Sequence, residues 1–414
     1  MSLTAQNFAV APALRGHVEA LASEEMEGRR AGSDGERAAA RYLYDALRDA
    51  GVLMLTDSLG QDFRISGEQG EIASQNIVGI VEGADPQLRA EYIVVGARYD
   101  HLGTHELTVD GEPVVQLYPG ADANASGVAV LVELARMVAQ YQGLFRRSIL
   151  FVGFGAGEEG MAGAWYFVNR AFDPLSAVKA MVDLDCLGRG SLSNPMQCFS
   201  QIAAIDRNYL LDKTREQPVV TLPVFTAEPP ISSDYLPFYE RQIPVFLFTT
   251  GPAREHRTIK DTPWRLDYSA MEAACNYLYH FLLVLAAQDA IVSEDDPAVR
   301  ASRGERVYAA SDCDVRPQFF HSDERHFLRN WVYKYLKYPL SAIEQNVQGQ
   351  VLVSFIVEQD GSVTDVRVEH GIDERLDDEA VRVVSVSPKW IPGQIKGRKV
   401  RTRIVIPVEF RLKK

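Results

Sequence analysis

Three acidic clusters, each at the end of an apolar run, constrain this chain more than any other feature. They are centred on Asp122, on Glu158 with Glu159, and on Asp183 with Asp185. In an open α/β sheet, ligands bind at the carboxyl ends of the strands. Carboxylates gathered there repel one another unless a divalent cation or a nearby arginine neutralises them. The sequence therefore predicts a cation site, or an arginine in its place, at one edge of a sheet.

Strand-like and helix-like segments alternate through residues 1–290, as is typical of parallel βαβ units. Apolar runs at 77–81, 92–95 and 243–248 indicate buried strands, and 268–287 indicates a long apolar helix. We predict an α/β domain over 1–290, with a mostly parallel sheet and helices on both faces. Asp110-Gly111, between short apolar pairs, predicts a hairpin flap over the mouth of the site.

A second domain is expected because 414 residues exceed one ordinary hydrophobic core. Residues 291–315 are charged and polar, so we interpret them as a linker. Residues 316–414 then show a different pattern, with helices expected at 322–336 and 377–384 and strands at 351–357, 363–368 and 400–410. This pattern predicts a small α+β domain.

Ordered motifs along the first domain resemble a known family. They are Leu21-Ala22-Ser23-Glu24-Glu25-Met26-Glu27-Gly28-Arg29, Tyr99-Asp100-His101-Leu102-Gly103, Gly160-Met161-Ala162-Gly163, Ser233-Asp234-Tyr235-Leu236-Pro237-Phe238-Tyr239 and His256-Arg257-Thr258-Ile259-Lys260-Asp261-Thr262. With the acidic clusters, they resemble the zinc-dependent aminopeptidase family, which includes the glutaminyl cyclases, over about 14–283. The resemblance implies the zinc exopeptidase fold but not the activity, because function depends on the site.

The resemblance also implies roles for individual residues. Active members of the family hold two zinc ions with two histidines and three carboxylates, and a separate glutamate is the general base. Asp122 matches the carboxylate that bridges both ions. Glu158 and His256 match ligands of the second ion, and Asp185 matches a ligand of the first. Asp100 matches the residue that orients the first histidine.

Two departures from the family pattern bear on catalysis. Arg98 occupies the position of the first histidine, and an arginine has no lone pair to offer a metal. Gly157 occupies the position of the general base, counted back from the downstream glycine motif. A shift of one residue would make Glu158 the base and Glu159 the ligand, but it requires an insertion and a compensating deletion close together.

A guanidinium near the first zinc position changes the expected chemistry. We predict that Arg98 pairs with Asp185, with Asp122 as a further candidate partner, and so replaces the cation electrostatically. The second position keeps three ligands and an open position, as in a catalytic zinc site. We expect zero or one zinc ion per chain, held by Asp122, Glu158 and His256. In the alternative without metal, Glu158 and His256 hydrogen-bond to each other.

Two further carboxylates are the candidate bases if catalysis survives. Asp185 and Asp234 match acidic residues of the proton network of the glutaminyl cyclases. Asp234 could instead cap a helix. His101 and His105 are interpreted as loop residues rather than as replacement ligands.

The C-terminal domain resembles the C-terminal domain of TonB-family proteins. The matching motifs are Tyr338-Pro339, Gly349-Gln350-Val351, Asp360-Gly361, Leu376-Asp377-Asp378-Glu379-Ala380 and Trp390-Ile391-Pro392-Gly393. The resemblance implies an interaction module of the Gram-negative envelope without a catalytic group. Such modules commonly pair an exposed sheet edge with a partner strand. The alternative is a stabilising appendage of the first domain.

Composition limits the partners. The net charge of -13 argues against binding to nucleic acid or anionic membranes. The four cysteines are scattered, and we favour free thiols. We find no stretch that is long and apolar enough to span a bilayer. No signal peptide is visible, although the start Met1-Ser2-Leu3 resembles an expression leader, which leaves a removed export signal open.

These observations favour a degraded zinc-aminopeptidase site on a peptide-binding or scaffolding protein of the periplasm or cell envelope. Its expected partners are a peptide or protein at the first domain and an envelope protein at the TonB-like domain. The alternative is an active single-zinc exopeptidase or a glutaminyl cyclase-like enzyme.

Overall fold

The computed structural model describes residues 7–412 except 58–59, 68–69, 110–111, 192, 203, 218, 220, 227, 289–290, 292–306, 321 and 360. The chain divides into two compact units, the first built from residues up to Glu294 and the second mainly from later residues. Most of the expected linker lies outside the described residues. Val307–Ala309, also assigned to that linker, forms strand β12 of the second unit.

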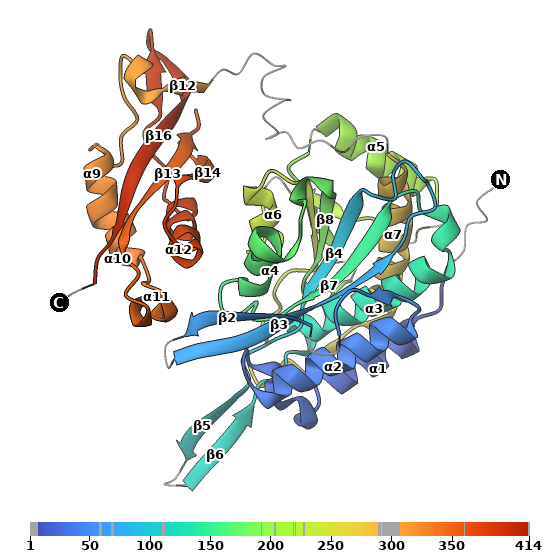
Figure 1. The fold of residues 1–414 in the computed structure, drawn as a ribbon. Helices are drawn as coiled ribbons and strands as arrows, with labels where there is room; N and C mark the ends of the chain where they lie inside the picture. Colours follow the sequence, from blue (N-terminus) through green and yellow to red (C-terminus); the bar gives the residue numbers. More distant parts are fainter. Residues whose placement is uncertain are drawn as a thin grey trace. The chain divides into compact units, whose positions relative to one another are not determined.

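A nine-stranded mixed sheet forms the centre of the first unit (Figure 1). Its strands are β1 (Leu53–Met54), β2 (Gln61–Gly67), β3 (Gly70–Val81), β4 (Tyr92–Arg98), β7 (Ser148–Phe154), β8 (Val178–Leu184), β9 (Gln197–Phe199), β10 (Val224–Thr226) and β11 (Val245–Thr249). The order is β1-β3-β7-β4-β8-β11-β9-β10, and β2 pairs with β3. The predicted parallel arrangement holds for β7, β4, β8 and β11, whereas β3 and β9 are antiparallel to β7 and β11.

Helices cover both faces of this sheet, as predicted (Figure 1). They are α1 (Ala11–Leu21), α2 (Asp34–Asp49), α3 (Ser126–Gln140), α4 (Ala162–Tyr166), α5 (Ala204–Arg215), α6 (Leu236–Glu240) and α7 (Tyr268–Ala287). Successive side chains of a strand point to opposite faces. Accordingly, Ile93 and Val95 of β4 enter the core that contains α3 and α7, while Val94 enters the core that contains α4 and α6.

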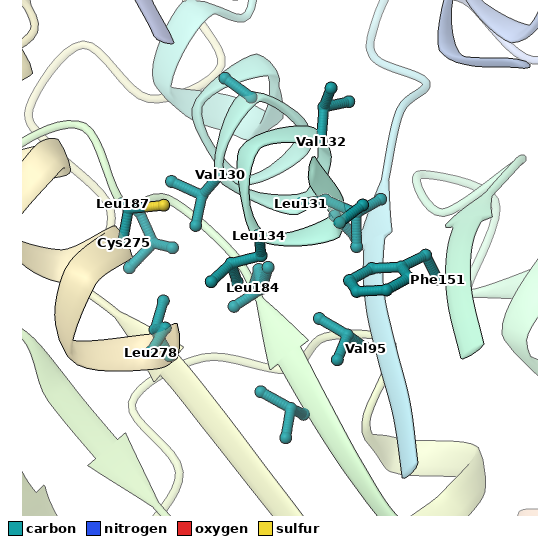
Figure 2. Packing of buried hydrophobic residues seen from close by; sticks show 14 of the residues in the cluster. Val95, Val130, Leu131, Val132, Leu134, Phe151, Leu184, Leu187, Cys275 and Leu278 are labelled. Atoms are coloured by element: carbon teal, nitrogen blue, oxygen red, sulfur yellow. The ribbon is translucent and has the colours of Figure 1, made fainter. Parts of the chain in front are cut away.

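The larger core lies between α3, α7 and the central strands. Figure 2 shows Val95 and Phe151 of the sheet facing Leu131 and Leu134 of α3, with Leu278 of α7 beside them. Nearly every residue of α3 is buried, as expected for a helix that is apolar on all sides. This packing fixes the strands whose carboxyl ends carry the acidic clusters.

Helix α7 bears on the expectation that no segment could cross a membrane. By length and composition it could, but 72% of its apolar window is buried inside the structure. Since a core helix of a globular domain passes the same test, the finding neither supports nor excludes a membrane span. Cys275 in this helix and the other three cysteines are free thiols, as favoured from the sequence.

The start of α2 provides a test of local stability. Ser33 is its N-cap, and its Oγ accepts a hydrogen bond from the backbone N of Glu36 at 3.1 Å. The substitution Ser33→Ala is expected to lower the free energy of unfolding by about 1 kcal/mol, because that N–H loses its partner. Ser269→Ala, the same change at an exposed position of α7, should alter it by less than about 0.5 kcal/mol. Equal losses in chemical denaturation would contradict the capping role.

A two-stranded hairpin leaves the first unit between β4 and α3. It consists of β5 (Thr104–Val109) and β6 (Glu112–Leu117), so the predicted hairpin is present and longer than expected. Its turn, Asp110-Gly111, lies outside the described residues. The hairpin projects away from the nine-stranded sheet (Figure 1), which does not support the expected flap over the site.

The second unit is a small α+β domain, as predicted. Its elements are β12, α9 (Glu324–Phe327), α10 (Tyr333–Tyr335), α11 (Leu340–Glu344), β13 (Gly349–Val357), β14 (Val363–His370), α12 (Glu374–Ser385), β15 (Gly393–Ile395) and β16 (Arg398–Phe410). The strand order is β12-β16-β13-β14, and β15 pairs with β16. Alternate residues of the two long strands form its core, including Val351, Val353 and Phe355 of β13 and Ile404 and Ile406 of β16.

Candidate functional site

Parallel pairing brings the carboxyl ends of β4, β7 and β8 to one edge of the sheet. Arg98 at the end of β4 lies opposite Phe154 at the end of β7. Asp185 directly follows β8, and Glu158 lies in the loop between β7 and α4. This edge therefore collects Arg98 and two of the three acidic clusters. The third, around Asp122, does not follow a strand of this sheet but lies between the hairpin strand β6 and helix α3.

Arg98 joins two of the acidic clusters. Its Nη1 donates to Oε1 of Glu158 at 2.7 Å, and its Nε and Nη2 donate to the two oxygens of Asp185 at 3.3 and 3.2 Å. The predicted ion pair with Asp185 is confirmed, and Glu158 is a partner that the sequence did not reveal. Burial lowers the pKa of Arg98, but the charges of Asp185 and Glu158 outweigh it and raise the pKa well above its usual value.

Glu158 is surrounded by cationic groups and a histidine. Arg257 donates to Oε2, while Nδ1 of His101 lies 3.5 Å from Oε1. Burial raises the pKa of Glu158, but the contact with His101 and the charges of Arg98 and Arg257 lower it to about 2. Both carboxylate oxygens thus face guanidinium groups. No pattern in the sequence pointed to Arg257, which follows the predicted ligand His256 and reaches Glu158 from a separate loop.

Asp100 holds a loop rather than a histidine. Its carboxylate accepts hydrogen bonds from the backbone N of Gly157 at 2.7 Å and of Glu158 at 3.0 Å. A Cβ added at Gly157 would lie 2.8 Å from Cβ of Arg98 and 3.1 Å from Oδ1 of Asp100. Because real Cβ atoms essentially never approach another heavy atom within 3.0 Å, this loop conformation has room only for glycine at position 157.

Asp122, which matches the bridging carboxylate of the family and is an expected ligand of a single zinc ion, has its hydrogen bonds with other groups than Arg98. Its Oδ1 accepts hydrogen bonds from the backbone N of Gly188 at 2.8 Å and Oγ of Ser126 at 3.2 Å. Its Oδ2 is buried and has no hydrogen-bond partner among the described residues. Burial and the nearby Asp261 raise the pKa of Asp122 to about 7. Asp261 itself caps the backbone N–H groups of Asp122 and Ala123, and so ties the His256 loop to this segment.

His256, the predicted ligand histidine, is half-buried. Its Nδ1 lies 3.9 Å from Sγ of Cys186, and burial together with the charge of Arg98 lowers its pKa. No hydrogen bond between His256 and Glu158 occurs among the described residues, which does not support the alternative in which they pair. His101 is buried beside Glu158, whereas His105 is an exposed residue of β5.

The two candidate bases differ in environment. Asp185 accepts hydrogen bonds from Arg98 and from Oγ of Ser233 at 2.8 Å, so its carboxylate oxygens already have hydrogen-bond donors. Asp234 is fully buried, and neither carboxylate oxygen has a hydrogen-bond partner in the described structure, so it does not cap a helix. Burial and the neighbouring Asp183 raise its pKa well above the usual value. The sequence did not single out Asp183 for this pairing.

The side chains do not form a metal site as they stand. Across the described residues, no group of three or more His, Cys, Asp or Glu side chains is placed to hold a metal ion. Guanidinium groups instead contact Glu158 and Asp185, two of the predicted ligands. The ligand set of Asp122, Glu158 and His256 therefore stays a prediction, and the geometry does not favour it.

Comparison with known proteins gives the family. Residues 76–282, half of the chain, match peptidase family M28. The chain belongs to peptidase family M28. Residues 334–412 match the C-terminal domain of Gram-negative bacterial TonB proteins. Both matches confirm the resemblances stated from the motifs.

Curated relatives and solved structures agree with this family. A probable zinc metalloprotease of Pyrenophora tritici-repentis is 32% identical over 112 residues, covering 27% of this chain and 24% of that protein. The BOS complex subunit NCLN of Rattus norvegicus is 30% identical over 172 residues, which cover 38% of this chain and 27% of that protein. The chain thus spans only about a quarter of these relatives.

Two solved structures show the fold alone, because their identity is low. A Zn-dependent exopeptidase from Parabacteroides distasonis has a TM-score of 0.52 at 18% identity, covering 67% of this chain and 99% of that one. A glutaminyl cyclase of Bacteroides thetaiotaomicron has a TM-score of 0.52 at 18% identity, and the match covers 69% of this chain and 100% of that one. The predicted zinc exopeptidase fold is therefore confirmed.

Proposed function

We propose that this member of peptidase family M28 is catalytically impaired and binds peptide or protein segments in the Gram-negative cell envelope. One observation carries the proposal. Arg98 stands at a ligand position and binds Glu158 and Asp185, two carboxylates that the family pattern assigns to metal. A permanently charged arginine repels a divalent cation at short range.

The general-base position supports the same conclusion. Gly157 has no side chain to activate a water, and a Cβ there would clash with Arg98. Loss of a general base typically reduces the rate by a factor of about 10²–10⁴. Neither a metal-ligating side chain at position 98 nor a general base at position 157 is present, which supports a site that serves a purpose other than hydrolysis.

Two matches support a role in binding. The TonB-like second unit belongs to a class of interaction modules, and it is the basis for the proposed envelope location. The relative NCLN is named as a subunit of a complex rather than as a peptidase. We therefore propose a peptide or protein partner for the first unit and an envelope protein partner for the second.

Metal content is the first test. After dialysis against zinc and then against metal-free buffer, elemental analysis is expected to find no more than one zinc ion per chain. The physical reason is that Arg98 pairs with Asp185, the expected ligand of the first ion, and also with Glu158, an expected ligand of the second. The same protein should not hydrolyse aminoacyl anilides or cyclise N-terminal glutamine at ordinary enzyme rates. Two tightly held ions, or turnover that a chelator abolishes, would contradict the proposal.

A second candidate function is a single-metal exopeptidase or a glutaminyl cyclase-like enzyme. The observation that favours it is the buried Oδ2 of Asp122, which lacks a hydrogen-bond partner among the described residues. Such an orphaned carboxylate oxygen is costly unless something binds it. One bound zinc together with chelator-sensitive cyclase or peptidase activity would establish this candidate instead.

A further inference from the structure

The hairpin of β5 and β6 is a two-stranded sheet that stands apart from the nine-stranded sheet (Figure 1). Its register runs from Thr104 opposite Leu117 to Val109 opposite Glu112. No other strand in the described parts of the chain pairs with either outer edge. Since an isolated hairpin is marginally stable in water and its edges carry unpaired N–H and C=O groups, the hairpin is suited to accept another strand.

Large aliphatic side chains are exposed on both faces of this hairpin. Leu107 and Val114 lie opposite each other and are 44% and 40% exposed. Val115, which lies opposite Glu106 and therefore points to the other face, is 61% exposed. An added strand would cover apolar side chains that flank an open edge. The hairpin thus offers apolar contacts beside its open backbone edges.

The negative charge of the hairpin indicates a positively charged partner. Glu106, Asp110 and Glu112 are acidic, and residues 104–117 contain no lysine or arginine. A second copy of the same hairpin would bring only further acidic charges and no lysine or arginine, so charge provides no attraction between two copies. A strand that carries lysine or arginine between aliphatic residues would match both the charge and the exposed apolar side chains.

We propose that the β5–β6 hairpin is a docking arm that adds an extended, basic segment of a partner protein as a further strand. Backbone hydrogen bonds along an edge supply affinity in this mode, and alternate side chains supply specificity. The base of the arm is anchored, because the N of Gly103 donates to O of Gly28 at 2.8 Å and the N of Tyr118 donates to O of Gly103 at 3.0 Å. The proposal does not depend on the metal content of the site.

Synthetic peptides test the mode of binding. The probe is a labelled peptide of about eight alternating lysines and valines, and the comparison is the same peptide with glutamates in place of lysines. We expect the basic peptide to bind the full chain at least about tenfold more tightly in fluorescence anisotropy. Methylation of alternate backbone nitrogens should weaken it by a similar factor, because it removes strand hydrogen bonds.

Charge reversal on the protein tests the location. In Glu106→Lys with Glu112→Lys, both exposed on the hairpin, the preference should shift toward the acidic peptide. The matched control is Asp212→Lys with Glu216→Lys, an equal charge change at the end of α5, where the side chains are 72% and 60% exposed. The control should keep the preference for the basic peptide. Circular dichroism confirms that both variants are folded.

Three outcomes would overturn the proposal. Equal weakening in the control variant would show that the net charge of the chain, and not the hairpin, attracts the peptide. Unchanged binding of the N-methylated peptide would exclude strand addition. A concentration-dependent dimer in sedimentation velocity that the hairpin variant abolishes would show that a second copy occupies the arm.

Discussion

Arg98→Met is expected to destabilise the first unit by about 3–5 kcal/mol, the usual cost of removing one partner from a buried ion pair. The side chains of Arg98, Glu158 and Asp185 are only 9%, 8% and 2% exposed. Without the guanidinium, the two carboxylates stay buried and lose their main cationic partner. Hydrogen exchange measured by mass spectrometry would detect the loss of stability as faster exchange in β4, β7 and β8, separately from the second unit.

Arg257→Met is the matched control, because Arg257 also contacts Glu158 but is 57% exposed. Solvent-exposed ion pairs contribute about 0–1 kcal/mol, so this variant should lose no more than that. Equal destabilisation by the two substitutions would show that Arg98 does not replace a buried cation.

The free energy of unfolding should depend on pH through the titration of Glu158. Its pKa is about 2 in the folded protein, below the value of about 4.3 expected when unfolded. The resulting stabilisation is fully present above that unfolded pKa and is lost as the pH falls toward 2. Arg98→Met removes part of it, so the difference in stability between variant and wild type should shrink as the pH falls through this window.

The double variant Arg98→His with Gly157→Glu is expected to bind zinc and to gain aminopeptidase activity far beyond the sum of the single variants. The new imidazole can ligate a metal, and Glu158 and Asp185 are released from the guanidinium. The new glutamate supplies the missing general base, worth a factor of about 10²–10⁴. Zinc stoichiometry and aminoacyl anilide hydrolysis measure the two gains separately.

Each single change should achieve little. Arg98→His alone leaves no base at position 157. Gly157→Glu places a Cβ 2.8 Å from the Cβ of residue 98, which arginine and histidine share, so the loop must shift and stability should fall in the single and the double variant alike. Gly157→Glu alone also leaves Glu158 and Asp185 paired with the guanidinium of Arg98. The control Arg98→His with Gly157→Gln has a side chain of the same size without a carboxylate, and it should bind zinc but stay inactive. If the two double variants hydrolyse equally slowly, the cleft has diverged beyond these two positions.

The sequence by itself determined the family, the domain types and the meeting of Arg98 with Asp185. The family follows from the resemblance of its ordered motifs. The domain types follow from apolar periodicity, which defines the strands, and parallel pairing brings the carboxyl ends of those strands to one edge.

Only the tertiary structure decided which ion pairs and hydrogen bonds the charged groups form. Arg257 contacts Glu158 across 99 positions of sequence, and Asp100 holds the loop that carries Glu158. The direction of the β5–β6 hairpin was likewise not readable from its turn residues. Such contacts depend on how loops from separate strands are positioned in space. The residues next to a side chain in the sequence do not determine that position.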